Sequence, residues 1–96
     1  ASHAYLGVSI GDGGAEADGT LRAGAEVGSV EQGSPAANAG LKQGDVITAI
    51  NGKTTSQAAA LTGFVRQYSA GDQVKLTVIR DGKSQEIEVT LAEKTS

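Results

Sequence analysis

The chain has 96 residues, of which 39% are hydrophobic and 20% charged, with fourteen glycines, no cysteine and a formal net charge of −3. This length and composition predict a single domain over residues 1–96, with a core of about residues 5–91, and exclude a disulfide-rich scaffold. The negative charge argues against nucleic-acid binding, which needs a basic surface, and no apolar run is long enough for this segment to insert into a membrane.

The first strand is predicted over residues 5–10, where apolar residues alternate with small or polar ones. Residues 11–24 are rich in Gly, Ala, Asp and Glu, and this composition predicts a mobile surface loop. Strand character resumes over residues 25–30, where the apolar residues break strict alternation. A bulge or bend near Gly28 would explain that break.

A short helix is predicted next, because the local sequence contains a start and a stop signal. Ser34 can cap the free amide groups, Pro35 fits the first helical position, and Gly40 can adopt the left-handed conformation that ends a helix. Residues 45–50 then form a predicted strand, which the Asn-Gly pair at 51–52 closes as a turn.

The last third of the chain predicts a longer helix and a hairpin. Ser56 is expected to cap a helix that runs to about Tyr68, since apolar residues recur there at helical spacing. Two alternating runs flank Asp81-Gly82, which supplies the positive φ angles of a two-residue hairpin turn. That turn predicts the facing pairs Leu76 with Ile87, Val74 with Val89, and Lys75 with Glu88.

Five or six short strands and two helices in so short a chain predict an α+β fold, as a compact sandwich or partly open barrel. No catalytic residue, metal ligand set or cofactor is expected. The only histidine is His3, near the end of the chain, so no base is available for a nucleophilic serine. Asp12, Glu16 and Asp18 do not match the spacing of a calcium loop and are expected to be solvated.

The run from Gly33 to Gly52, GSPAANAGLKQGDVITAING, resembles the signature of PDZ domains, and Tyr5-Leu6-Gly7-Val8 resembles their carboxylate-binding loop. The resemblance covers about residues 5–91 and is nearest to the PDZ domains of bacterial HtrA-type (Deg-type) serine proteases. It implies the permuted strand order of those domains, which agrees with the expectation that no strand precedes Tyr5.

The resemblance also implies a binding site for the C-terminal residues of a peptide, which would add as a strand beside residues 8–10. The peptide carboxylate would be held by backbone N–H groups of the loop, and the long helix would form the opposite wall. The implied site residues are Tyr5, Leu6, Gly7, Val8, Ser9, Ile10, Ala58, Leu61 and Val65, with Arg22 as a further candidate beside the carboxylate. Those that are apolar could equally be core residues, and the two roles are compatible.

PDZ domains that select Ser or Thr two residues before the terminus have a histidine at the head of this helix. This chain has Gln57-Ala58 there, so the resemblance implies apolar C-termini as ligands. The implied function is to bind such ends of substrate or misfolded proteins, and to tether them to, or regulate, an HtrA-type protease domain absent from this chain.

The fragment itself is expected to be inactive, and its parent to be a trypsin-like endopeptidase of the bacterial cell envelope, in a periplasmic or extracytoplasmic location. Two alternatives stay open. The domain could belong to another envelope protease, of the site-2 or C-terminal-processing type, or to a secretion or scaffold adaptor without a protease.

Overall fold

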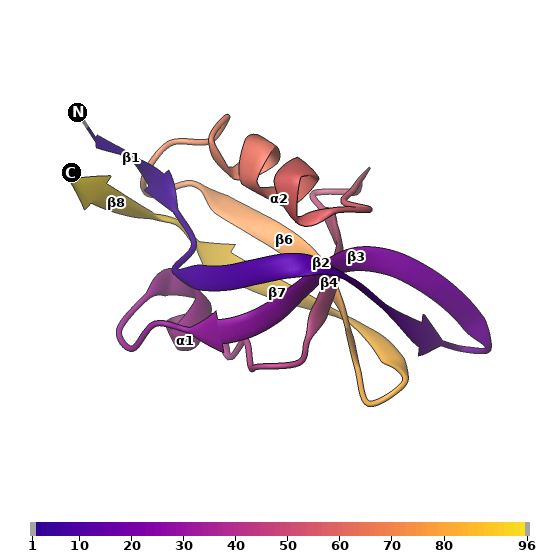
Figure 1. Cartoon of the computed structure of the whole chain (residues 1–96). Helices are drawn as coiled ribbons and strands as arrows, with labels where there is room; N and C mark the ends of the chain where they lie inside the picture. The colour runs from indigo at the N-terminus through magenta and orange to yellow at the C-terminus, as the bar shows by residue number, and fades with distance from the viewer. Residues whose placement is uncertain (1, 96) are drawn as a thin grey trace.

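The computed structural model describes the backbone of residues 2–95 and the side chains of residues 5–92. The described residues form eight strands and two helices (Figure 1). In chain order the elements are β1 (Ser2–Tyr5), β2 (Val8–Ala17), β3 (Thr20–Val30), α1 (Pro35–Ala39), β4 (Val46–Ile50), β5 (Lys53–Thr54), α2 (Ala58–Val65), β6 (Gln73–Arg80), β7 (Lys83–Thr90) and β8 (Ala92–Thr95).

The main sheet is antiparallel and six-stranded, in the order β2-β3-β4-β6-β7, with the short β5 paired to β4. In Figure 1, α2 lies above the strands and α1 below them. This open sheet with two helices confirms the predicted α+β fold. The strands β2 and β7 are its two edges, so one side of each has unpaired backbone groups.

The turn signal of the β6–β7 hairpin and the cap signals of α1 are confirmed. The β6–β7 hairpin turns at Asp81-Gly82, where φ is 53° and 77°, and its register pairs Leu76 with Ile87. At the start of α1, the Ser34 hydroxyl accepts a hydrogen bond of 3.2 Å from the backbone N–H of Ala37. Local chemistry is sufficient to predict such features, because each depends on a few neighbouring residues.

The predicted loop over residues 11–24 is wrong. The segment forms the outer half of a long β2–β3 hairpin that turns at Asp18-Gly19, where φ is 53° and 79° (Figure 1). Near this turn, the side chain of Ala17 is buried against Val46 and Ile79, which packs the hairpin against the rest of the sheet. The high glycine content indicated a loop, although Asp18-Gly19 is a turn signal of the same type as Asp81-Gly82 in the β6–β7 hairpin. The predicted bulge is confirmed, because the β2–β3 register shifts so that Gly28 has no partner.

The predicted bounds of the longer helix are also wrong. The helix α2 begins at Ala58 and ends at Val65, and Gln57, not Ser56, occupies the cap position without a side-chain cap bond. The carboxylate of Asp12, on β2, instead accepts a hydrogen bond of 2.9 Å from the backbone N–H of Ala58. The first turn is thus capped by a residue from a distant part of the chain, which local sequence cannot reveal.

A strand does begin before Tyr5, contrary to the expectation, because β1 starts at Ser2. The backbone of β1 pairs antiparallel with that of β8, with Tyr5 opposite Ala92, and the two strands lie side by side near the ends of the chain in Figure 1. The segment is too short for a periodic pattern to predict it, and its pairing partner is 87 residues away in the Tyr5–Ala92 pair.

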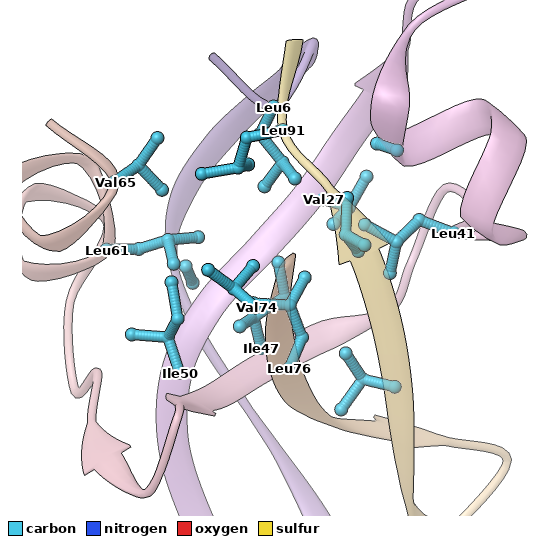
Figure 2. Packing of buried hydrophobic residues seen from close by; sticks show 14 residues of the cluster. Leu6, Val27, Leu41, Ile47, Ile50, Leu61, Val65, Val74, Leu76 and Leu91 are labelled. Atoms are coloured by element: carbon cyan, nitrogen blue, oxygen red, sulfur yellow. The ribbon is translucent and has the colours of Figure 1, made fainter. Parts of the chain in front are cut away.

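The main core fills the space between the sheet and both helices. Figure 2 shows Leu61 and Val65 projecting from α2 toward Leu6 and Leu91. Ile47 and Leu76 lie deeper in the same cluster. The core is built from aliphatic side chains, as expected for a chain with so few aromatic residues.

Candidate functional site

A groove runs between the edge strand β2 and the helix α2, and one end of it opens into a pocket of about 240 Å³. Most of the predicted site residues come together at this pocket. They are Tyr5, Leu6, Gly7, Val8 and Ile10 from the first loop and strand, and Leu61 and Val65 from α2. The pocket therefore has a backbone wall on one side and an aliphatic helix wall on the other.

The two carbonyl groups of the loop before β2 accept hydrogen bonds from other parts of the fold. The Leu6 carbonyl accepts a hydrogen bond of 3.0 Å from the N–H of Ala36, and the Gly7 carbonyl accepts one of 2.9 Å from the N–H of Glu31. The N–H groups of Leu6 and Gly7 donate to no acceptor within the described part of the chain. Two successive free N–H groups at a pocket can bind an anion.

Only glycine fits at position 7. Its φ of +86° lies in the left-handed region, and an ideal Cβ there would lie 2.2 Å from the Cβ of Ser34. The side chain of Ser34 is itself fixed, because its hydroxyl donates to the Glu31 carbonyl at 2.7 Å while it caps α1. The shape of the loop therefore depends on the absence of a side chain at Gly7.

The helix wall belongs to the core and to the pocket at once. Leu61 is 1% exposed and Val65 8% exposed, and both are members of the main hydrophobic cluster. Leu6 lies across the pocket from them. It is 6% exposed, and it too belongs to the main hydrophobic cluster. These three residues therefore belong to the core and also line the pocket.

Three of the predicted site residues do not line the pocket. Ser9 is exposed on the other face of β2, and Ala58 lies at the start of α2, partly buried against the core. Arg22 lies opposite Ala15 in the outer half of the β2–β3 hairpin, so the structure does not bring it to the loop at Gly7.

Three lining residues were missed, namely Glu31, Thr62 and Arg66. Thr62 and Arg66 are four residues apart, so helical spacing places them on one side of α2, and this is the signal that could have revealed them. No sequence signal marks Glu31, which reaches the pocket because its N–H is bonded to the Gly7 carbonyl. Arg66 and Glu31 place charges of opposite sign at the same end of the groove.

The described residues contain no group of three or more His, Cys, Asp or Glu side chains that could hold a metal ion. They also contain no helix long and apolar enough to cross a membrane. The side chain of His3 lies outside the described ones. The chemistry that the described groove offers is therefore free backbone amides, one cationic and one anionic side chain, and an aliphatic surface.

Comparisons with known proteins agree on one kind of domain. The PDZ domain family matches residues 4–91. The chain is 43% identical over 76 residues to the periplasmic pH-dependent serine endoprotease DegQ of Escherichia coli, covering 79% of this chain and 17% of that protein. It is 40% identical over 77 residues to the serine protease Do-like HtrA of Lactococcus lactis, covering 80% of this chain and 19% of that protein.

Two solved structures share the fold. The HtrA-type protease AlgW with a decapeptide superposes with a TM-score of 0.83 at 23% identity, covering 99% of this chain and 30% of that one. The serine endoprotease from Yersinia pestis superposes with a TM-score of 0.80 at 23% identity, covering 98% of this chain and 30% of that one. The chain thus spans less than a third of the length of each of these four proteins.

Proposed function

The chain belongs to the PDZ domain family, and we propose that its groove binds the C-terminal end of a polypeptide as an added strand. Its relatives are serine proteases of the HtrA type. The observation that carries the proposal is the position of the Gly7 loop. Its two free amides lie where the open edge of β2 begins, beside an aliphatic pocket.

In the proposed complex the peptide backbone pairs with the outer edge of β2, which pairs only with β3 among the described strands. The terminal carboxylate accepts hydrogen bonds from the N–H groups of Leu6 and Gly7. Arg66, at the end of α2, adds a positive charge on this side of the pocket.

The last side chain of the peptide enters the pocket and contacts the apolar surfaces of Leu6, Leu61 and Val65. We propose that an apolar residue is preferred there, since this part of the pocket offers only hydrocarbon to it. The residue two positions earlier faces the start of α2, where Ala58 has no polar side chain with which to select a hydroxyl group.

The proposal extends to the parent protein. We propose that residues 1–96 are one PDZ domain, that a serine protease domain is attached to it in the parent chain, and that the whole acts in the bacterial cell envelope. The names of the relatives support this, since they are periplasmic or HtrA-type serine proteases. The fold neighbour AlgW, solved with a decapeptide, supports the peptide as partner. Damaged or misfolded proteins, which expose apolar ends, are the proposed ligands.

A free-acid peptide that ends in Leu or Val should bind with a Kd of about 1 μM, or about −8 kcal/mol. The C-terminally amidated copy should bind at least about tenfold more weakly, because the amide lacks the charge that the Leu6 and Gly7 amides bind, a loss of about 1.4 kcal/mol. Isothermal titration calorimetry with the two copies measures the difference. Equal affinities would contradict recognition of the peptide end.

The isolated domain should not hydrolyse casein or small ester substrates. No serine lines the described pocket, and the chain has a single histidine, His3, so the sequence offers few partners for a nucleophile–base pair. Release of fluorescent fragments from labelled casein, followed for hours with repurified protein, measures this. Activity that persists after repurification and is lost when one serine of this chain is changed to alanine would overturn the expectation.

A further inference from the structure

Asp12 extends the groove beyond its apolar part. Val8, Ile10 and Asp12 are alternate residues of β2, so their side chains lie on one face of the strand. Val8 and Ile10 line the pocket, and the Asp12 Oδ1 atom accepts a hydrogen bond of 2.9 Å from the N–H of Ala58 on α2. The carboxylate thus bridges the strand and the helix at the end of the groove opposite to the Gly7 loop.

The negative charge at this position is not neutralised within the described part of the chain. The one ion pair among the described residues joins Arg80 to Asp45, and the second carboxylate oxygen of Asp12 has no hydrogen-bond partner there. The residue opposite Asp12 on β3 is Ala25, whose small side chain is buried in the core. The residue is exposed, so an incoming group can reach the free oxygen.

The register of a bound peptide follows from the site already proposed, on which this inference rests. If the carboxylate is held by the amides of the loop just before β2, the last peptide residue lies opposite Val8, the first residue of that strand. In an antiparallel pair each further step moves one residue along both strands. The residue two before the last then lies opposite Ile10, and the residue four before the last opposite Asp12.

We propose that Asp12 is a specificity-determining residue, which makes the groove prefer peptides with Lys or Arg four residues before the C-terminal residue. Side chains that lie directly opposite each other share a face, with Cβ atoms about 4.5–5.5 Å apart. A lysine or arginine at this position can therefore reach the free Asp12 oxygen without breaking the bond to Ala58. A glutamate there meets a like charge instead.

The experiment compares two free-acid peptides, Gly-Ser-Gly-X-Ala-Val-Ala-Leu with X as Lys or Glu, by calorimetry at low salt. The wild-type chain should bind the Lys peptide about fivefold more tightly, since opposite charges attract and like charges repel across the pair. Asp12→Asn keeps an oxygen that can accept from Ala58 but removes the charge, and should reduce the ratio to less than about twofold.

Glu16→Gln is the matched control. Glu16 lies on the same face of β2, four residues further along and about 13 Å away, so the variant changes the net charge equally and should keep the wild-type ratio. Moving X one residue closer to the C-terminus places it opposite Gly11, on the other face, and should weaken the preference.

The proposal is overturned if the wild-type chain binds both free-acid peptides equally, or if Asp12→Asn leaves the preference unchanged. In either case, carboxylate-dependent binding by the same chain would leave the proposed function intact. An amidated Lys peptide that binds as tightly as its free acid would instead contradict the proposed function itself. The two failures are therefore distinguishable with one set of peptides.

Discussion

A Gly7→Ala variant is expected to lose most of its peptide binding and about 2–4 kcal/mol of its free energy of unfolding. A φ of +86° costs an alanine about 1–2 kcal/mol relative to glycine. The new methyl group would also lie 2.2 Å from the Cβ of Ser34, and the loop must move to relieve this contact. Movement of the loop displaces the Leu6 and Gly7 amides, which are the proposed carboxylate ligands.

Urea unfolding and calorimetric titration of a free-acid peptide measure the two effects separately. Gly71→Ala is the control for backbone strain, since Gly71 has a φ of +92° but nothing within 4 Å of an added Cβ. This control should lose about 1–2 kcal/mol of stability and retain its peptide affinity. A Gly7→Ala variant that binds like the wild type would show that the loop does not hold the carboxylate.

The sequence predicted those parts of the fold that a few neighbouring residues determine. Asp81-Gly82 sets the register of its hairpin, and Ser34 and Gly40 set the ends of α1, by local chemistry alone. The β2–β3 hairpin has an equally local turn signal at Asp18-Gly19. The Gly, Ala, Asp and Glu content of residues 11–24 is typical of a loop, and for this reason the hairpin was not predicted from the sequence.

The remaining errors have tertiary causes. The start of α2 is capped by Asp12, which lies 46 residues earlier in the chain, so the serine nearest to the helix was mistaken for the cap. The position of Ala17 as a buried strand residue depends on Val46 and Ile79, which approach it only in the folded sheet. No local pattern contains either contact.

The residues of the candidate site also fall into two groups, those predicted from the sequence and those placed by contacts between distant segments. The loop and strand residues were predicted from their resemblance to a known motif, and the structure brings most of them to one pocket. Glu31 reaches that pocket only because the chain after β3 returns to pair with the Gly7 carbonyl. Arg22, by contrast, is carried away by the hairpin that was not expected.

The ion pair between the buried Asp45 and the partly exposed Arg80 should make the largest single electrostatic contribution to stability. Asp45 is 2% exposed, and Arg80 binds it through two hydrogen bonds of 2.8 and 2.5 Å while also donating to the Gly40 carbonyl at 2.9 Å. The Arg80 side chain thereby ties β6 to the end of α1. Because removing one partner leaves an uncompensated charge or an unsatisfied guanidinium, Asp45→Asn should cost about 3 kcal/mol at neutral pH.

The pH dependence of this loss has a defined sign. Burial alone would raise the pKa of Asp45, but the hydrogen bonds from Arg80 and from the backbone N–H of Lys42, with the positive charges of both residues, lower the pKa below its ordinary value. A carboxyl group whose pKa is lower in the folded state stabilises the fold fully above its unfolded pKa of about 3.9, and this contribution is lost as the pH falls through the folded pKa. The wild-type chain should therefore lose stability in acid, and the variant should lose less.

Urea unfolding of the wild type and of Asp45→Asn at pH 7 and at a pH of about 2.5 measures this difference. The gap in free energy of unfolding should be about 3 kcal/mol at pH 7 and clearly smaller in acid. Asp72→Asn is the control. Asp72 is exposed, and among the described residues its carboxylate accepts only from the N–H of Ser69, at 2.8 Å, so the change should cost about 1 kcal/mol or less. Two results would contradict the prediction. The loss in free energy of unfolding for Asp45→Asn could be no larger than that for Asp72→Asn, or it could stay constant with pH. Either result would show that the charge of Asp45 does not stabilise the packing of β6 against the end of α1.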